Sequence, residues 1–128
     1  MKEAPRRPRP RILVIDDDQS IRELVNLHLK NAGYEVQLAE DAIDAGKAVL
    51  EAPPALILID VNMPYMNGYE FAEALKADPV TRDIPLVFVT VDDEVAIRSR
   101  ALGAVAYLRK PLRADRLLDV VRLFAAEA

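Results

Sequence analysis

Apolar residues recur along the chain in short runs that are separated by longer stretches with helical periodicity. Four runs have the character of β-strands, at residues 12–15, 56–59, 86–89 and 105–108. Most of them are nearly uninterrupted hydrophobics, which is typical of parallel strands covered on both faces. A fifth run, residues 35–38, alternates polar and apolar positions and therefore predicts an edge strand with one wetter face.

The stretches between these runs predict five helices. Apolar residues repeat with a 3.6-residue period in residues 21–32, 42–50, 69–77, 93–102 and 114–126. Regular alternation of strand and helix predicts a parallel sheet with helices on both faces. Because crossovers are right-handed and the second strand is the wetter one, we expect a flavodoxin-like doubly wound sheet with strand order 2-1-3-4-5.

Composition and charge narrow the class of protein. A chain of 128 residues without cysteine has room for one domain and has no disulfide or thiolate chemistry. Residues 1–10 are basic and rich in proline, so we expect a flexible leader followed by one domain over residues 11–126. The remaining body is more acidic than the overall net charge of −4, which argues against direct binding of nucleic acid. With neither a secretory signal nor a membrane-spanning run, the chain is expected to be cytoplasmic.

Polar residues follow the predicted strands where each strand ends. Asp16 and Asp17 follow the first strand, Asp60 the third, Thr90 the fourth and Lys110 the fifth. Ligands of open parallel sheets bind outside the carboxyl ends of the strands, so these side chains are expected to meet in one crevice. Clustered carboxylates either raise one another's pKa or recruit a cation, and oxygen ligands would favour Mg²⁺, or Mn²⁺ in its place.

Such a site fits phosphoryl transfer onto an aspartate. Asp60 would act as the nucleophile and form an acyl phosphate, while Lys110 and the metal ion neutralise charge and Thr90 donates a hydrogen bond. Mg²⁺ keeps several waters and binds through one or two carboxylates plus phosphate oxygens. We therefore expect the protein to supply only part of the metal coordination, which the phosphoryl group completes.

Four separated motifs resemble the receiver domain of response regulators of two-component systems. They are residues 12–18, 58–68, 89–90 and 107–112, and they occur in the family's order at the expected strand ends. The resemblance implies that Asp60 is the phospho-acceptor of a histidine kinase or phosphotransfer protein. It also implies metal binding by Asp16, Asp17, Asp60 and the backbone carbonyl of Asn62.

The same resemblance implies a conformational switch. Thr90 and Lys110 match the hydroxyl and lysine that hold the phosphoryl oxygens, and Tyr107 matches an aromatic switch that follows Thr90. Pro111 matches a proline whose preceding peptide bond is cis, here Lys110-Pro111. Phosphorylation would then remodel the face formed by the last two helices and the last strand.

Two residues beside Thr90 are expected to modulate access to Asp60. The family commonly has Ala or Gly after the hydroxyl, and the β-branched Val91 stands there instead. Asp92 could tune the access of water to a phosphoryl group. The acidic run of residues 92–94 is interpreted as the start of the fourth helix, favoured by the helix dipole.

Two other functions are weighed against the signalling switch. A Mg²⁺-dependent phosphohydrolase with an Asp nucleophile usually needs a second acid two residues further on, where this chain has Asn62. A flavin binder would need a phosphate loop rather than three acids after the first strand. The switch would act through a downstream protein effector or an output domain outside this sequence, and a dimer linked to phosphorylation stays open. We expect no turnover of an external metabolite and no membrane partner.

Overall fold

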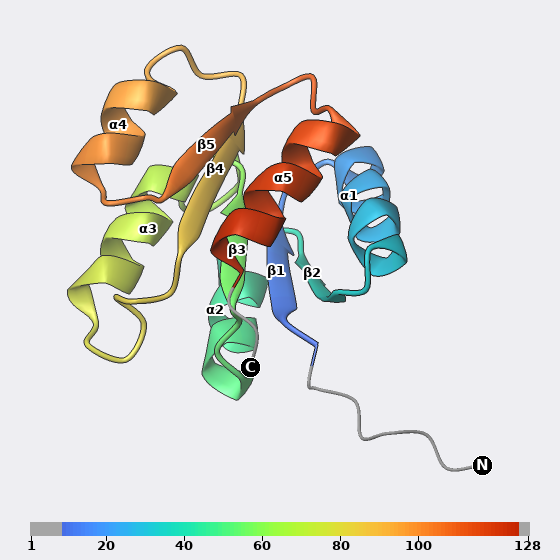
Figure 1. The fold of residues 1–128 in the computed structure, drawn as a ribbon. Coiled ribbons are helices and arrows are strands. Elements are labelled where there is room, and N and C mark those ends of the chain that lie inside the picture. Colours follow the sequence, from blue (N-terminus) through green and yellow to red (C-terminus); the bar gives the residue numbers. More distant parts are fainter. Residues whose placement is uncertain (1–8, 126–128) are drawn as a thin grey trace.

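The computed structural model describes residues 9–125, which form a parallel sheet of five strands covered by helices (Figure 1). The strands are β1 (Arg11–Ile15), β2 (Glu35–Ala39), β3 (Leu56–Ile59), β4 (Leu86–Thr90) and β5 (Ala106–Arg109). They alternate with the helices α1 (Gln19–Asn31), α2 (Ala42–Glu51), α3 (Gly68–Ala77), α4 (Val95–Ala101) and α5 (Ala114–Phe124). The sheet order is β2-β1-β3-β4-β5, which confirms the predicted flavodoxin-like topology.

The burial of the strands follows their hydrophobic patterns. β3 and β4 are buried along their whole length, and β1 is buried after Arg11. The edge strand β2 has no buried residue before Ala39, which agrees with its prediction as a wetter edge, although Leu38 is itself exposed. The sheet is therefore anchored by its three central strands.

Alternate side chains of the central strands pack into two separate hydrophobic cores, because successive residues of a strand point to opposite faces of the sheet. One core joins Leu13, Ile57 and Phe88 to the helices α2, α3 and α4. The other joins Val14, Leu58 and Val87 to the helices α1 and α5. Figure 1 shows the two helical layers on opposite sides of the sheet.

Some predicted boundaries are wrong. α4 begins at Val95 rather than at residue 93, because Asp92 forms a turn in which its Oδ1 accepts from the Glu94 N–H at 3.4 Å and its carbonyl from the Val95 N–H at 3.3 Å. The acidic run therefore precedes the helix instead of starting it. α5 ends at Phe124, since Ala125 already has extended backbone.

Parts of two expectations lie outside the described residues. Most of the predicted leader, residues 1–8, and the predicted end of the domain at residue 126 belong to the undescribed ends of the chain. Within residues 9–125, no helix combines the length and the apolar character that crossing a bilayer requires.

Candidate functional site

The predicted site residues lie at the carboxyl ends of four strands. Asp16 and Asp17 follow β1, Asp60 follows β3, Thr90 ends β4, and Lys110 follows β5. β1 and β3 are neighbours in the sheet, and the helices that follow them, α1 and α3, cover opposite faces. The chain thus diverges at this point and leaves a crevice, which is where open α/β sheets bind ligands.

Three carboxylates meet a single ammonium group in this crevice. One oxygen from each of Asp16, Asp17 and Asp60 lies within 4.8 Å of the others. Asp16 and Asp60 are only 2% and 5% exposed, whereas Asp17 is open to solvent. Lys110 Nζ lies 2.9 Å from Asp16 Oδ2 and 3.5 Å from Asp60 Oδ2. The cluster therefore holds more negative than positive charge.

The protonation of Asp60 reflects this environment. Burial, and next the charge of Asp16, raise the pKa of Asp60 to about 6, while Lys110 and the backbone N–H of Asn62 oppose the rise. That N–H donates to Asp60 Oδ1 at 3.3 Å. Asp60 consequently loses its proton less readily than an exposed carboxylate does, because its charged form is poorly solvated and lies beside Asp16.

Lys110 stays charged despite its partial burial. Burial lowers the pKa of this ammonium group, but the hydrogen bond and charge of Asp16, together with Asp60, outweigh burial and raise the pKa above its usual value. A permanently charged donor between two acids is suited to hold an anionic group that approaches Asp60.

The donor set fits a hard divalent cation. All side-chain donors in the cluster are carboxylate oxygens, one of which is exposed on Asp17. A divalent ion would offset the excess negative charge that Lys110 leaves, and oxygen-only ligands are those that Mg²⁺ prefers. The cluster can therefore hold a metal ion.

Asp16 is held in place by the turn that follows β1. The Asp18 N–H donates to Asp16 Oδ1 at 2.9 Å, and Arg22 Nη1 donates to the Asp16 carbonyl at 2.6 Å. Asp18 in turn caps α1 by accepting from the Ser20 and Ile21 N–H groups. The sequence analysis missed the contact of Arg22, because nothing in the helical periodicity distinguishes this residue from the other polar positions of α1.

The loop after Asp60 approaches the site closely and needs glycine at one position. The Gly68 N–H donates to the Val61 carbonyl at 2.8 Å, and a Cβ on Gly68 would clash with the Asp60 carbonyl oxygen and come within 2.9 Å of Val61 Cα. Asn67 caps α3 in a capping box with Glu70. Backbone contacts of this kind fix the position of Asp60.

The predicted switch residues lie at the edge of the crevice. Thr90 is fully buried, and its Oγ1 accepts from the Asp92 N–H at 3.1 Å, while its carbonyl accepts from the Lys110 N–H at 3.0 Å. Tyr107 is 40% exposed on β5, and Val91 is 61% exposed beyond the end of β4. The Lys110–Pro111 peptide bond is cis.

Tyr69 is a residue beside the site that the sequence analysis did not single out. Its hydroxyl donates to Asp92 Oδ2 at 2.6 Å, so the Asp92 carboxylate is engaged by α3. Arg98 of α4 lies over the Tyr69 ring. Residues 69 and 92 are far apart in the sequence and belong to no common motif, so only the fold reveals the contact.

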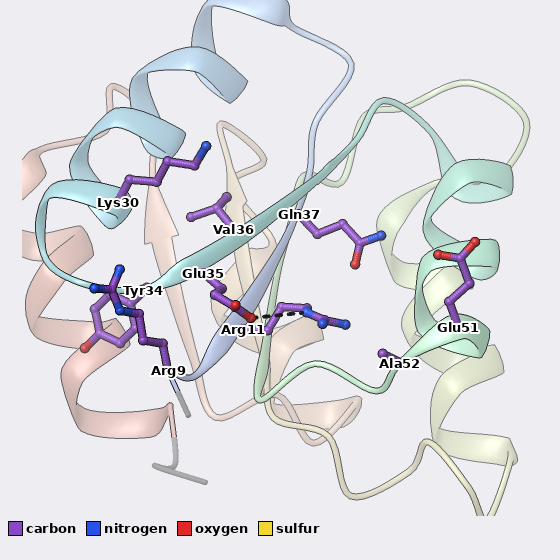
Figure 2. Close-up of a pocket in the computed structure, with 9 residues that line it drawn as sticks. All are labelled: Arg9, Arg11, Lys30, Tyr34, Glu35, Val36, Gln37, Glu51 and Ala52. Carbon is purple, nitrogen blue, oxygen red and sulfur yellow. Dashed lines mark ion pairs between the residues drawn. The ribbon is translucent and has the colours of Figure 1, made fainter. Parts of the chain in front are cut away.

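A larger groove lies at the opposite end of the sheet. It has a volume of about 700 Å³ and is lined by Arg9, Arg11, Lys30, Tyr34, Glu35, Val36, Gln37, Glu51 and Ala52 (Figure 2). Its charges largely offset one another, and Arg11 pairs with Glu35 at 3.8 Å. The clustered acids and the partly buried Lys110 lie instead at the carboxyl ends of the strands, so the candidate site is placed there.

A doubly wound parallel sheet with three acids, a hydroxyl and a lysine at its carboxyl edge defines a class of signalling domain. The family model of the response regulator receiver domain matches residues 12–122. The chain therefore belongs to the receiver domain family of response regulators of two-component systems, which are signalling switches.

Individual relatives support the same family. The chain is 36% identical over 115 residues to the DNA-binding dual master transcriptional regulator RpaA of Synechocystis sp., covering 88% of this chain and 48% of RpaA. It is 36% identical over 109 residues to the phosphate regulon transcriptional regulatory protein PhoB of Pseudomonas aeruginosa, covering 84% of this chain and 48% of PhoB. The chain thus spans about half the length of these relatives.

Solved structures share the whole fold. The chemotaxis protein CheY4 of Vibrio cholerae has a TM-score of 0.84 and 33% identity, with 91% of this chain and 98% of that chain covered. A response regulator from Chloroflexus aurantiacus has a TM-score of 0.85 and 29% identity, covering 92% of this chain and 99% of the other. A receiver fold of this length therefore accounts for nearly all of the chain.

Proposed function

We propose that this receiver domain accepts a phosphoryl group on Asp60, in a Mg²⁺-dependent reaction, from a histidine kinase or a phosphotransfer protein. The observation that carries the proposal is the environment of Asp60. A buried carboxylate with a pKa of about 6 lies 3.5 Å from a lysine ammonium and beside two further acids. This arrangement offers a nucleophile, a positive charge for the incoming oxygens and oxygen ligands for a cation.

The transfer itself needs little from the protein beyond alignment and charge. Asp60 attacks phosphorus as a carboxylate, the new P–O bond forms as the donor's P–N or P–O bond breaks, and the leaving group takes the bonding pair. Lys110 Nζ stabilises the transferred oxygens, and the Thr90 hydroxyl donates a hydrogen bond to one of them. Before transfer, the Asn62 N–H helps to orient Asp60 through the bond to Oδ1.

Asp16, Asp17, Asp60 and the backbone carbonyl of Asn62 would hold the metal ion, which is Mg²⁺, with Mn²⁺ as a substitute. When bound, the ion supplies charge neutralisation for the phosphoryl oxygens. The exposed carboxylate of Asp17 suits a direct ligand, whereas Asp16 is already bonded to Lys110 at 2.9 Å and suits a contact through water.

The output of the switch would be a protein surface. Thr90 and Tyr107 lie on neighbouring strands, β4 and β5, so a movement of Thr90 toward the phosphoryl group can be followed by Tyr107. We expect the face of α4, β5 and α5 to change its affinity for a downstream protein or for an output domain.

The test is incubation of the purified chain with acetyl phosphate, with and without Mg²⁺, followed by intact-mass measurement. A gain of one phosphoryl group that requires both the metal and Asp60 supports the proposal, and the matched control is Asp60→Asn. Continuous release of phosphate from many monoesters would favour the phosphohydrolase alternative. Failure of the wild-type chain to gain mass with Mg²⁺ present would refute the proposed function.

A further inference from the structure

Tyr69 connects α3 to the segment that carries the predicted switch hydroxyl. It is the second residue of α3 and is 7% exposed. Its ring packs edge-on against Phe88 of β4 with a centroid distance of 5.1 Å, and Arg98 Cζ of α4 lies 4.9 Å from the ring centroid. One side chain therefore contacts both elements that flank the β4–α4 loop, residues 91–94.

The Tyr69 hydroxyl reaches the loop itself through Asp92. It donates to Asp92 Oδ2 at 2.6 Å, and the backbone N–H of Asp92 donates to Thr90 Oγ1 at 3.1 Å. Asp92 Oδ1 also accepts from the Glu94 N–H at 3.4 Å. A single residue of the loop thus joins the phenol of Tyr69 to the hydroxyl of Thr90.

The charges favour this arrangement at neutral pH. Burial, and next the hydrogen bond to Asp92, raise the pKa of the Tyr69 phenol above its usual value, so the phenol remains a donor. The hydrogen bond from Tyr69 is the largest cause that lowers the pKa of Asp92, so its carboxylate remains ionised. Hydrogen bonds to an ionised acceptor are stronger than neutral ones.

We infer that Tyr69 is a positioning residue of the proposed phosphoryl-acceptor site. Through its hydrogen bond to Asp92, Tyr69 holds the β4–α4 loop in the arrangement in which the Asp92 N–H donates to Thr90 Oγ1. The inference rests on the proposed function. A turn of Thr90 toward a phosphoryl oxygen stretches its contact with the Asp92 N–H, and the Tyr69–Asp92 bond resists any compensating movement of the loop. The bond therefore favours the unphosphorylated arrangement.

Removing the bond is expected to ease that movement. Beryllofluoride with Mg²⁺ is a suitable probe, because it imitates a phosphoryl group on a carboxylate without a phosphodonor protein. We expect Tyr69→Phe, which keeps the ring, to bind beryllofluoride about 2- to 10-fold more tightly than wild type, the range of one net hydrogen bond. Asp92→Ala should give a similar gain, and the double variant should gain no more than either single variant.

The control is Tyr34→Phe, which removes a hydroxyl at the opposite end of the sheet and should leave the affinity unchanged. Two spectroscopic measurements distinguish a positioning role of the Tyr69–Asp92 hydrogen bond from a merely structural role of Tyr69. The Thr90 and Asp92 amide resonances should shift in Tyr69→Phe, and the titration of the buried phenol should move to lower pH in Asp92→Ala. Because Asp92→Ala leaves the ring packing intact, it tests the bond even where Tyr69→Phe loses stability.

The possible results separate the role of Tyr69 from the proposed phosphoryl acceptance at Asp60. Unchanged or weaker beryllofluoride binding by both single variants, or fully additive gains in the double variant, would overturn the role of Tyr69 alone. A wild-type chain that does not bind beryllofluoride in the presence of Mg²⁺ would refute the proposed function and this inference with it.

Discussion

Replacement of Asp60 by asparagine should stabilise the metal-free fold at neutral and alkaline pH. Burial and the charge of Asp16 raise the pKa of Asp60 from 3.8 to about 6. The folded state therefore binds this proton more tightly than the unfolded chain does. The resulting stabilisation is complete below the unfolded pKa and is lost as the pH rises through 6. Above that pH the ionised carboxylate opposes folding, and a neutral amide of the same shape removes the opposition.

The magnitude follows from the size of the shift. A difference of roughly two pKa units corresponds to about 3 kcal/mol of unfolding free energy. The crevice opens to solvent at its rim, and water screens part of this interaction, so we expect about 1–2 kcal/mol for Asp60→Asn. The amide oxygen can still accept the hydrogen bond that the Asn62 N–H now donates to Asp60 Oδ1.

Urea denaturation in the presence of a chelator measures this effect. The stability advantage of Asp60→Asn over wild type should be about 1–2 kcal/mol near pH 8. It should shrink to a small fraction of that value near pH 4, where Asp60 is protonated in the folded state and about half protonated in the unfolded chain. Asp119→Asn, at an exposed position on α5, removes one negative charge and controls for the change in net charge. An advantage that is absent near pH 8, or is equal at the two pH values, would refute the electrostatic reasoning.

Three further substitutions test other parts of the site. Gly68→Ala should cost about 2–3 kcal/mol in urea denaturation because its Cβ meets backbone atoms of Asp60 and Val61, whereas Gly46→Ala, with open space around it in α2, should not destabilise. Tyr65→Gly should stabilise the fold by about 0.5–1 kcal/mol, since Tyr65 has a φ of 71°, and a loss of stability would contradict strain at this residue. Val91→Ala should be phosphorylated faster by acetyl phosphate and should lose its phosphoryl group faster, because a smaller side chain opens the approach to Asp60. Equal rates for Val91→Ala and wild type would refute a role of Val91 in restricting access to Asp60.

The convergence of the acids, Thr90 and Lys110 could be predicted because it depends on topology alone. In a parallel sheet, the residue that follows each apolar run lies at one edge whatever the details of packing. Identification of the runs therefore placed Asp16, Asp60 and Lys110 near one another, although positions 16 and 110 are 94 residues apart. The wetter second strand likewise placed β2 at the edge of the sheet, as observed.

Contacts that depend on side-chain conformation could not be predicted in this way. The acids at residues 92–94 suit the first turn of a helix, but the Asp92 side chain instead closes a turn onto the Glu94 N–H, and α4 starts later. The bond from Tyr69 to Asp92 spans 23 residues and two elements, and it depends on how the α3 side chain packs against Phe88. No periodicity in the sequence carries that information.

The position of Lys110 between the two buried acids links the stability of the fold to its proposed chemistry. Burial and the charge of Asp16 raise the pKa of Asp60, and Lys110 offsets this only in part, because its ammonium group lies closer to Asp16, at 2.9 Å, than to Asp60, at 3.5 Å. The same deficit of positive charge opposes folding when Asp60 is ionised and favours the arrival of a cation beside it. A site with a second lysine to neutralise the remaining negative charge would be more stable, but it would attract a metal ion less strongly.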